Sequence, residues 1–258
     1  MTSILAVVNQ KGGVGKTTTA INIASFLAIG GSRVLLVDMD PQGNASSGIG
    51  IERKVNRKTV YDVLIHEVPI REAIAENVLP NLSVLPANID LAGAEIEMIN
   101  RLSRETILTE ALSTVQGNYD FVFIDVPPSL GLLTLNALVA ANALIIPIQA
   151  EYYALEGIGH LMKTVEIVRK RLNPNLEIAL VLMTMVDVRY RLAQQVIEEV
   201  KLYFGDKVSK NLITRNVKLS EAPSHGLPIS LYDPRSKGAQ LYKQIAEEVR
   251  KYAEKSTR

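Results

Sequence analysis

The feature that most constrains the fold is the stretch VVNQKGGVGKTTTAIN, Val7 to Asn22, in which an apolar run passes through a glycine-rich loop into a helical pattern. It matches the phosphate-binding pattern G-x-x-x-x-G-K-[ST] at Gly15, Lys16 and Thr17, whereas Gln10 stands where the first glycine is usual. In this order of elements, backbone N–H groups and a helix N-terminus converge on phosphates. The sequence therefore predicts a nucleotide site on a strand–loop–helix unit.

Within this loop, Lys16 is expected to bring positive charge to the phosphates, and the Thr17 hydroxyl is expected to bind Mg²⁺. Lys11 is one lysine more than such a loop needs. The residues alone leave two interpretations of it. It is either solvated on a tight turn, or it reaches the nucleotide of a second subunit and adds positive charge as the γ-phosphoryl group leaves. The expected nucleotide-binding residues of the loop are Lys11, Gly12, Gly13, Val14, Gly15, Lys16, Thr17 and Thr18.

Short apolar, β-branched runs alternate with longer amphipathic segments along the chain. Runs that are apolar on both faces are typical of buried strands in a parallel sheet. The expected strands are 3–9, 33–40, 81–87, 120–126, 143–150 and 178–185. The expected helices are 16–29, 104–116, 132–141, 154–172, 190–204 and 237–253. The pattern predicts an α/β fold with a mostly parallel twisted sheet and helices on both faces.

Aspartates end two of these apolar runs. Asp125 ends FVFIDV, and Asp38 and Asp40 end LLVDMD, two residues apart and therefore on the same side of the strand. From such a position a carboxylate reaches Mg²⁺ or its bound water. Strand-end aspartates also form turns and cap helices. Beside a phosphate loop we expect a metal site of Thr17, Asp38 and Asp125.

Composition excludes several classes of protein. The 258 residues contain no cysteine, so disulfides, thiolate metal sites and iron–sulfur clusters are excluded. Three dispersed histidines show no metal-ligand spacing. No apolar run approaches about 18 residues, so a soluble, cytoplasmic protein is expected. Residues 41–60, rich in Gly, Ser and Asn, are expected to be an irregular loop near the nucleotide.

The charge is unevenly distributed along a nearly neutral chain. The net charge is +1, yet residues 186–258 carry 14 Lys and Arg against 9 Asp and Glu. This excess is a weak indication of contact with a phosphate backbone. No base-reading helix-turn-helix, zinc finger or aromatic stacking platform is apparent. Any DNA binding is therefore expected to be independent of sequence and sensitive to salt.

The motifs together resemble one family over essentially the whole chain. KGGVGKTT with its leading lysine resembles the deviant Walker A loop of the ParA/MinD ATPases. DMDPQGN, DVPPSLGLLTLNAL, QAEYYALEG and RNVKLSEAPSHGLPI resemble the chromosomal ParA (Soj) branch. The resemblance implies slow ATP hydrolysis with Mg²⁺, an ATP-sandwich homodimer, non-specific binding to double-stranded DNA and stimulation by a ParB/Spo0J partner. It also implies chromosome or plasmid partition in the cytoplasm, on the nucleoid.

The resemblance also assigns roles to positions that match the family's motifs. Lys11 would act across the dimer, with Gly12 at the closest approach of the subunits. Asp40 would be the catalytic aspartate that positions the attacking water, beside Lys16. Met185 and Asn216 would contact adenine, although Thr214 replaces the proline common there. The candidate DNA contacts are Arg189, Arg191, Arg215, Lys218 and Lys237. The segment 151–157 would be a helix start, or part of a switch at the dimer face.

Sibling families define the alternatives. Nitrogenase-type reductases and iron–sulfur scaffold ATPases need cysteines that this chain lacks. The phosphate loop begins ten residues into the chain, so 1–258 is expected to be one ATPase domain without an N-terminal helix-turn-helix domain. Two alternatives stay open. One is a MinD-like membrane-positioning ATPase, whose membrane contact would be the apolar stripe of 241–252, although core packing of that stripe is favoured. The other is a metabolic P-loop enzyme such as a ligase.

Overall fold

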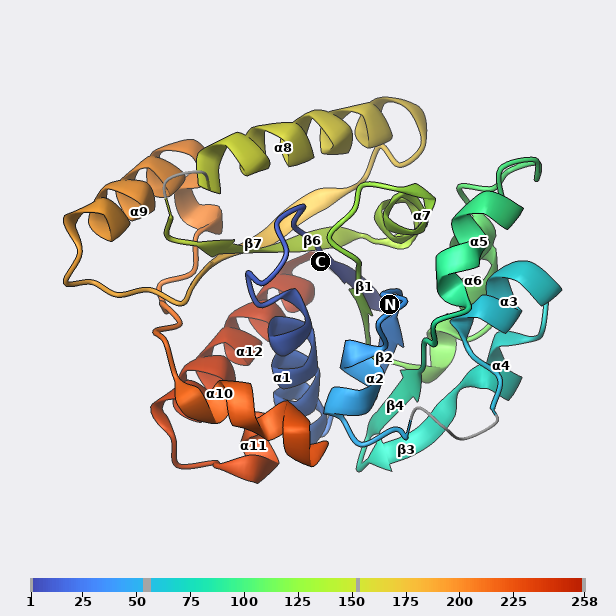
Figure 1. Ribbon diagram of the computed structural model, residues 1–258, viewed down its shortest axis with the longest axis horizontal. Helices are drawn as coiled ribbons and strands as arrows, with labels where there is room; N and C mark the ends of the chain where they lie inside the picture. The colour runs from blue at the N-terminus through green and yellow to red at the C-terminus, as the bar shows by residue number, and fades with distance from the viewer. Residues whose placement is uncertain (1, 53–56, 152–153, 257–258) are drawn as a thin grey trace.

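One seven-stranded sheet organises the computed structural model, which describes residues 2–52, 57–151 and 154–256 (Figure 1). Its strand order is β3-β4-β2-β5-β1-β6-β7. All neighbouring strands run parallel except β3 and β4, which pair antiparallel at one edge. The strands are β1 (Ser3–Val7), β2 (Val34–Asp38), β3 (Ala75–Leu79), β4 (Leu82–Leu85), β5 (Phe121–Asp125), β6 (Ala143–Gln149) and β7 (Glu177–Thr184).

Helices cover both faces of the sheet. The helices of eight or more residues are α1 (Lys16–Ile29), α7 (Leu132–Ala140), α8 (Ala154–Arg171), α9 (Arg191–Phe204) and α12 (Lys237–Ser256). The shorter ones are α2 (Asn44–Gly48), α3 (Val60–His66), α4 (Ile70–Ala73), α5 (Leu91–Glu97), α6 (Ile107–Ser113), α10 (Val217–Glu221) and α11 (Ile229–Tyr232), with 3₁₀ turns η1 (Gln116–Asn118), η2 (Gly205–Lys207) and η3 (Ala222–His225).

Two apolar cores fill the space between the sheet and its helices. The core on one face joins the sheet to α1, α2, α11 and α12, with α1 and α12 packed side by side (Figure 1). The core on the other face joins it to α3, α5, α6, α7, α8 and α9. Both faces of the central strands are therefore buried, which explains their uninterrupted apolar sequences.

The central position of β5 brings the strand-end carboxylates together. In the sheet, Asp125 of β5 is the register partner of both Val7 of β1 and Asp38 of β2. Because β1 runs directly into the phosphate loop, the loop and the two aspartates lie at the same edge of the sheet. In open α/β folds this carboxyl edge is where ligands bind.

The α/β fold class and the six expected strands are confirmed, but the expectations for several segments were wrong. The helix expected over 104–116 is the shorter α6, because a turn precedes Ile107. The segment 41–60 is not wholly irregular, because it contains α2, and residues 53–56 lie outside the described residues. Strand β3 and the short helices α3, α4, α5, α10 and α11 were not predicted, since they are too short for periodicity to show them.

Candidate nucleotide-binding site

The phosphate loop lies between the end of β1 and the start of α1. Gly13 and Gly15 have positive φ angles of 74° and 88°, a conformation that glycine adopts without strain. Gly15 is the N-cap of α1, so no Cβ obstructs the helix N-terminus. The loop is fastened to the sheet by Thr184, whose hydroxyl donates to the Val14 carbonyl at 2.8 Å. The backbone is therefore shaped to present N–H groups to an anion.

Lys16 lies almost fully buried at the start of α1. Its ammonium donates to the Lys11 carbonyl at 3.2 Å, which holds the loop closed around it. Burial lowers the pKa of Lys16, while the nearby carboxylates of Asp125 and Asp40 oppose that change. Phosphate oxygens bound at the loop would replace these carboxylates as the negative partners of the buried Lys16 ammonium.

Lys11 does not lie free on the loop surface. Its ammonium forms an ion pair with the Glu151 carboxylate, just beyond β6. The Lys11 backbone N–H donates to Asn9 Oδ1 at 3.0 Å, and Asn9 in turn donates to the Pro147 carbonyl at 2.7 Å. The Lys11 backbone is thus linked through Asn9 to β6, and its side chain is paired with an acid just after β6. The neighbouring Gly12 is exposed. The motif QAEYYALEG that supplies Glu151 includes residues 152–153, which lie outside the described residues.

Asp38 and Asp125 are both completely buried but differ in their partners. Asp38 accepts hydrogen bonds from the Ser46 N–H and hydroxyl, both at 2.7 Å, and from the Asp40 N–H at 3.1 Å. Burial nevertheless raises the pKa of Asp38 to about 6. Burial also raises the pKa of Asp125 well above its usual range, aided by Asp38 and opposed by Thr17 and Lys16. Neither oxygen of Asp125 has a partner at ordinary hydrogen-bond geometry among the described residues, although the Thr17 hydroxyl lies near enough to lower the pKa of this carboxyl.

The orphaned carboxylate of Asp125 fits a magnesium ion. Buried polar atoms are normally paired, so two unpaired oxygens beside a phosphate loop indicate a missing partner. Mg²⁺ takes oxygen ligands and is usually held by one or two protein groups together with substrate phosphates. The Thr17 hydroxyl lies beside Asp125, and its role as a second ligand stays a prediction. Asp38 already has its oxygens engaged by Ser46 and Asp40, so its role as a ligand stays a prediction.

Asp40 lies just past the end of β2, nearly buried. Its Oδ1 accepts from the Gln42 N–H at 2.9 Å, and its carbonyl accepts from the Gly43 N–H at 2.8 Å. The Asp40 carboxylate lies near enough to the Lys16 ammonium to oppose the lowering of the Lys16 pKa by burial. The acid is therefore placed to act on a group bound at the phosphate loop.

A cavity of about 460 Å³ adjoins the phosphate loop and contains both expected adenine contacts. Its lining includes Gly15, Thr18, Met185, Thr214 and Asn216. Met185 has a positive φ of 52°, and Asn216 Oδ1 caps α10 by accepting from the Lys218 N–H at 2.9 Å. The size and position suit a nucleoside attached to phosphates on the loop.

Of the five basic candidates, Arg215 lines this cavity, and the other four belong to segments linked to its lining. Val186 bridges to Thr214, which brings the Arg189 and Arg191 segment beside Arg215, and Arg215 itself lines the cavity. Lys237 is exposed at the start of α12, next to Gly238. Gly238 packs so closely on the 216–219 segment that a Cβ would lie 2.9 Å from Asn216 Nδ2. The fold therefore gathers basic residues that are distant in sequence.

Two of these cations are paired with acids that the sequence analysis did not identify. Arg189 makes two side-chain hydrogen bonds to Asp187, at 2.8 and 2.6 Å, and lowers the pKa of Asp187 to about 2. Lys218 bonds Glu221 at 2.8 Å, and Glu221 also accepts from the Tyr232 hydroxyl. The i,i+2 and i,i+3 spacings of these pairs are the sequence signals that could have identified them. Glu151, the partner of Lys11, carries no such local signal.

The apolar stripe of α12 packs into the core, as expected. Tyr242, Ile245, Ala246 and Val249 are buried in the core that includes α1, and Tyr242 shares a hydrogen bond with Thr19 at 3.2 Å. This face is therefore committed to the protein interior. Among the described residues, no helix is both long enough and apolar enough to cross a membrane.

A glycine-rich loop after β1, a buried lysine at the first turn of α1 and acids at neighbouring strand ends define a P-loop nucleotide-hydrolysing protein. A family profile described as an AAA domain matches residues 2–178. The chain is 57% identical to the sporulation initiation inhibitor protein Soj of Bacillus subtilis, over 96% of this chain and 98% of that protein. It is 52% identical to the chromosome partitioning protein ParA of Caulobacter vibrioides, over 95% and 93%. The chain belongs to the Soj/ParA family of chromosome-partitioning ATPases.

Solved structures agree on the fold. A Mycobacterium smegmatis protein described as cobyrinic acid a,c-diamide synthase, with bound ATP analogue and magnesium, is 38% identical, with a TM-score of 0.87 over 100% of this chain and 98% of that one. The cell division ATPase MinD of Pyrococcus furiosus is 26% identical, with a TM-score of 0.77 over 97% and 99%. The P-loop fold of the chain is therefore shared by proteins that are described with different functions.

Proposed function

We propose that this chain is an ATP-dependent dimerising ATPase that binds double-stranded DNA without sequence preference. In this proposal residues 1–258 act as one domain, and the protein drives chromosome or plasmid partition with a ParB/Spo0J-like partner. Hydrolysis is slow until the partner stimulates it. The protein works in the cytoplasm, on the nucleoid.

The protein is a partition ATPase that uses ATP and Mg²⁺. In the proposal, residues 11–18 hold the phosphates, Lys16 neutralises them, and Thr17 and Asp125 hold the metal. Bound Mg²⁺ supplies positive charge that offsets the charge developing on the phosphate oxygens. Met185 and Asn216 border the cavity that receives adenine. The orphaned oxygens of Asp125 support this assignment most directly.

Hydrolysis in this proposal requires two subunits. Asp40 orients the attacking water beside the phosphate loop. Lys11 leaves Glu151 and reaches the nucleotide of the second subunit, with Gly12 allowing close approach because it is exposed and a Cβ there would meet no atom within 4 Å. ATP is then both the substrate and part of the dimer interface, and its hydrolysis separates the subunits.

The observation that carries the DNA proposal is the position of the basic residues around the nucleotide cavity. Arg215 lines the space for the nucleoside, Lys218 follows the lining residue Val217, and the segments of Arg189, Arg191 and Lys237 are neighbours of that lining. Dimerisation doubles this basic surface, and two linked surfaces bind a polyanion more tightly than one. ATP-controlled dimerisation therefore becomes ATP-controlled DNA affinity, which a partition switch needs.

The test is binding of purified Asp40→Ala protein to a random-sequence duplex, with ADP or ATP–Mg²⁺, at low and moderate salt. We expect tight, salt-sensitive binding only with ATP, because this variant retains ATP in the dimer. Arg189→Glu should lose DNA binding and keep the ATP-dependent dimer. Arg33→Glu is the matched control, since Arg33 also pairs with an aspartate but lies away from the cavity. Equal DNA binding with ADP and ATP would sink the proposal.

Two alternative functions give different results in the same experiment. A membrane-positioning ATPase would bind anionic liposomes with ATP, and liposomes are therefore included beside the duplex. A ligase, which the description of the Mycobacterium protein as a synthase would suggest, would turn over ATP only with a small-molecule cosubstrate. The identities of 57% and 52% to Soj and ParA over nearly the whole chain favour partition.

A further inference from the structure

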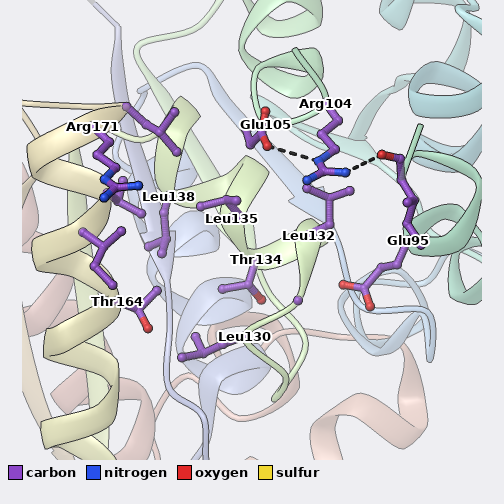
Figure 2. A pocket seen from close by; sticks show the side chains of 15 residues that line it. Glu95, Arg104, Glu105, Leu130, Leu132, Thr134, Leu135, Leu138, Thr164 and Arg171 are labelled. Carbon is purple, nitrogen blue, oxygen red and sulfur yellow. Dashed lines mark hydrogen bonds and ion pairs between the residues drawn. The ribbon is translucent and has the colours of Figure 1, made fainter. Parts of the chain in front are cut away.

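A groove of about 850 Å³ lies on the opposite face of the sheet from α1, over helix α7 (Figure 2). Figure 2 shows α7 as its floor, α8 as one wall and the α5–α6 segment as the other. The floor is formed by Leu132, Leu135 and Leu138, and Ile167 and Leu172 project from the α8 wall, both exposed. Leu138 is fully buried at the bottom of the groove, so the apolar surface offered to a partner comes from Leu132, Leu135, Ile167 and Leu172.

Charges of opposite sign stand on the two walls. Arg171, at the end of α8, makes no ion pair within the described part of the chain. On the other wall Glu105 is already paired with Arg104, as the dashed line in Figure 2 shows. Glu95 uses only Oε1, which accepts from the Leu133 N–H at 3.1 Å, and its Oε2 has no partner among residues 2–52, 57–151 and 154–256. The groove therefore offers one cation and one anion across an apolar floor.

The groove is also fastened to the loop that follows Asp125. Thr134, which lines the groove, donates to the Ser129 carbonyl at 2.6 Å. The Glu95 carboxylate lies against Gly131, where a Cβ would be 2.0 Å from Oε1. Together these contacts fix the start of α7 and the end of the 126–131 loop. An occupant that draws Glu95 away would shift the segment leading back to Asp125.

We propose that this groove is the docking site for an amphipathic helical segment of the activating partner. The segment lays apolar side chains on α7, with a basic residue facing Glu95 Oε2 and an acidic residue facing Arg171. Charge complementarity and the apolar floor favour this occupant over a second copy of the chain, whose proposed interface is at Lys11 and Gly12. The inference rests on the proposed function, since it locates the stimulation that the proposal requires.

The test uses the full-length protein and the full-length ParB/Spo0J-like protein of the same genome, with ATPase stimulation measured as partner is added. Ile167→Glu places a charge in the groove, and Arg171→Glu reverses the cation. Each should raise the partner concentration for half-maximal stimulation about tenfold. Ile29→Glu and Lys170→Glu are matched controls outside the lining, because Ile29 is 60% exposed against 57% for Ile167, and Lys170 is the neighbour of Arg171.

Support requires that both groove variants keep wild-type basal turnover, ATP-dependent dimerisation and DNA binding while losing stimulation, and that both controls behave as wild type. Undiminished stimulation of the groove variants overturns the docking site and leaves the proposed function standing. Loss of the ATP-dependent dimer in the groove variants makes the groove an interface between copies and also overturns the inference. A wild-type protein that the partner does not stimulate overturns both the inference and the partner assignment. The duplex-binding experiment with ATP and ADP then still tests the proposed DNA-binding function.

Discussion

The strand-end region and the basic segment both carry charged side chains, but they hold those charges differently. We use strand-end region for Lys16, Asp38 and Asp125, and basic segment for residues 186–218. The charges of the strand-end region are buried, and their pKa values are shifted mainly by burial. In the basic segment Arg189 is 82% exposed and is balanced by Asp187 two residues away. A buried charge is costly unless its partner is present, whereas an exposed pair contributes little and is screened by salt.

The largest effect is expected in the strand-end region, from Lys16→Ala. The variant loses the cation that meets the phosphates, and the remaining acids then repel them. We expect ATP affinity to fall by about 100-fold or more, since charge-assisted contacts in a buried site are strong. Titration with a fluorescent ATP analogue measures this. Lys11→Ala is the control and should still bind ADP, because its side chain faces Glu151. Unchanged ATP affinity of Lys16→Ala would show that the burial of this cation has no binding role.

The second prediction concerns the stability cost of the buried Asp38. Burial raises the pKa of this carboxyl from 3.8 to about 6. The folded state therefore binds the proton more tightly than the unfolded state, and the cost of the ionised group grows as pH rises from about 4 to 6. It reaches about 3 kcal/mol above pH 6. Asp38→Asn should therefore gain stability over wild type as pH rises.

Urea unfolding without nucleotide at pH 5 and 7.5 tests this prediction. About half of the gain should appear between these two values. The gain will be smaller if the Asn amide cannot satisfy the Ser46 donors. Asp187→Asn is the control, because the pKa of Asp187 is lowered to about 2 and both states are ionised over this range. A pH-independent difference for Asp38→Asn would contradict the assigned cost.

The contrast between the two regions also explains what the sequence could predict. Long apolar runs ending in aspartate locate the strands and their ends, because burial on both faces of a strand gives an uninterrupted apolar sequence. The candidate residues at the phosphate loop were found in this way. Helix α5 and the groove beside it were not predicted, since α5 is only seven residues long and too short for periodicity to show it, whereas α6 lies within the predicted helix 104–116. Glu151 was not identified as the partner of Lys11, because the pair joins positions 140 residues apart.

Glu151→Gln would sharpen the comparison. Lys11 lies on the phosphate loop beside the strand-end region, yet its ammonium is held by a partly exposed ion pair, as in the basic segment. The Lys11 and Glu151 side chains are 38% and 46% exposed, so their ion pair is worth about 1 kcal/mol or less. If Glu151 restrains Lys11 from reaching a second subunit, the variant should dimerise about two- to fivefold more tightly with ATP. Analytical ultracentrifugation with ATP and ADP measures this. Weaker dimerisation would instead make Glu151 part of the interface.

The smallest effect is expected in the basic segment, from Asp187→Asn. Removing this carboxylate frees the Arg189 guanidinium for a DNA phosphate and removes a nearby negative charge. We expect about twofold to threefold tighter binding of a random duplex to the ATP-bound protein, because exposed ion pairs are weak competitors. The gain should shrink as salt rises, since both the lost and the new interaction are screened. Asp120→Asn, which frees Arg33 away from the cavity, should leave affinity unchanged. Equal gains in both variants would mean that net charge alone, rather than the position of Arg189 beside the nucleotide cavity, sets DNA affinity.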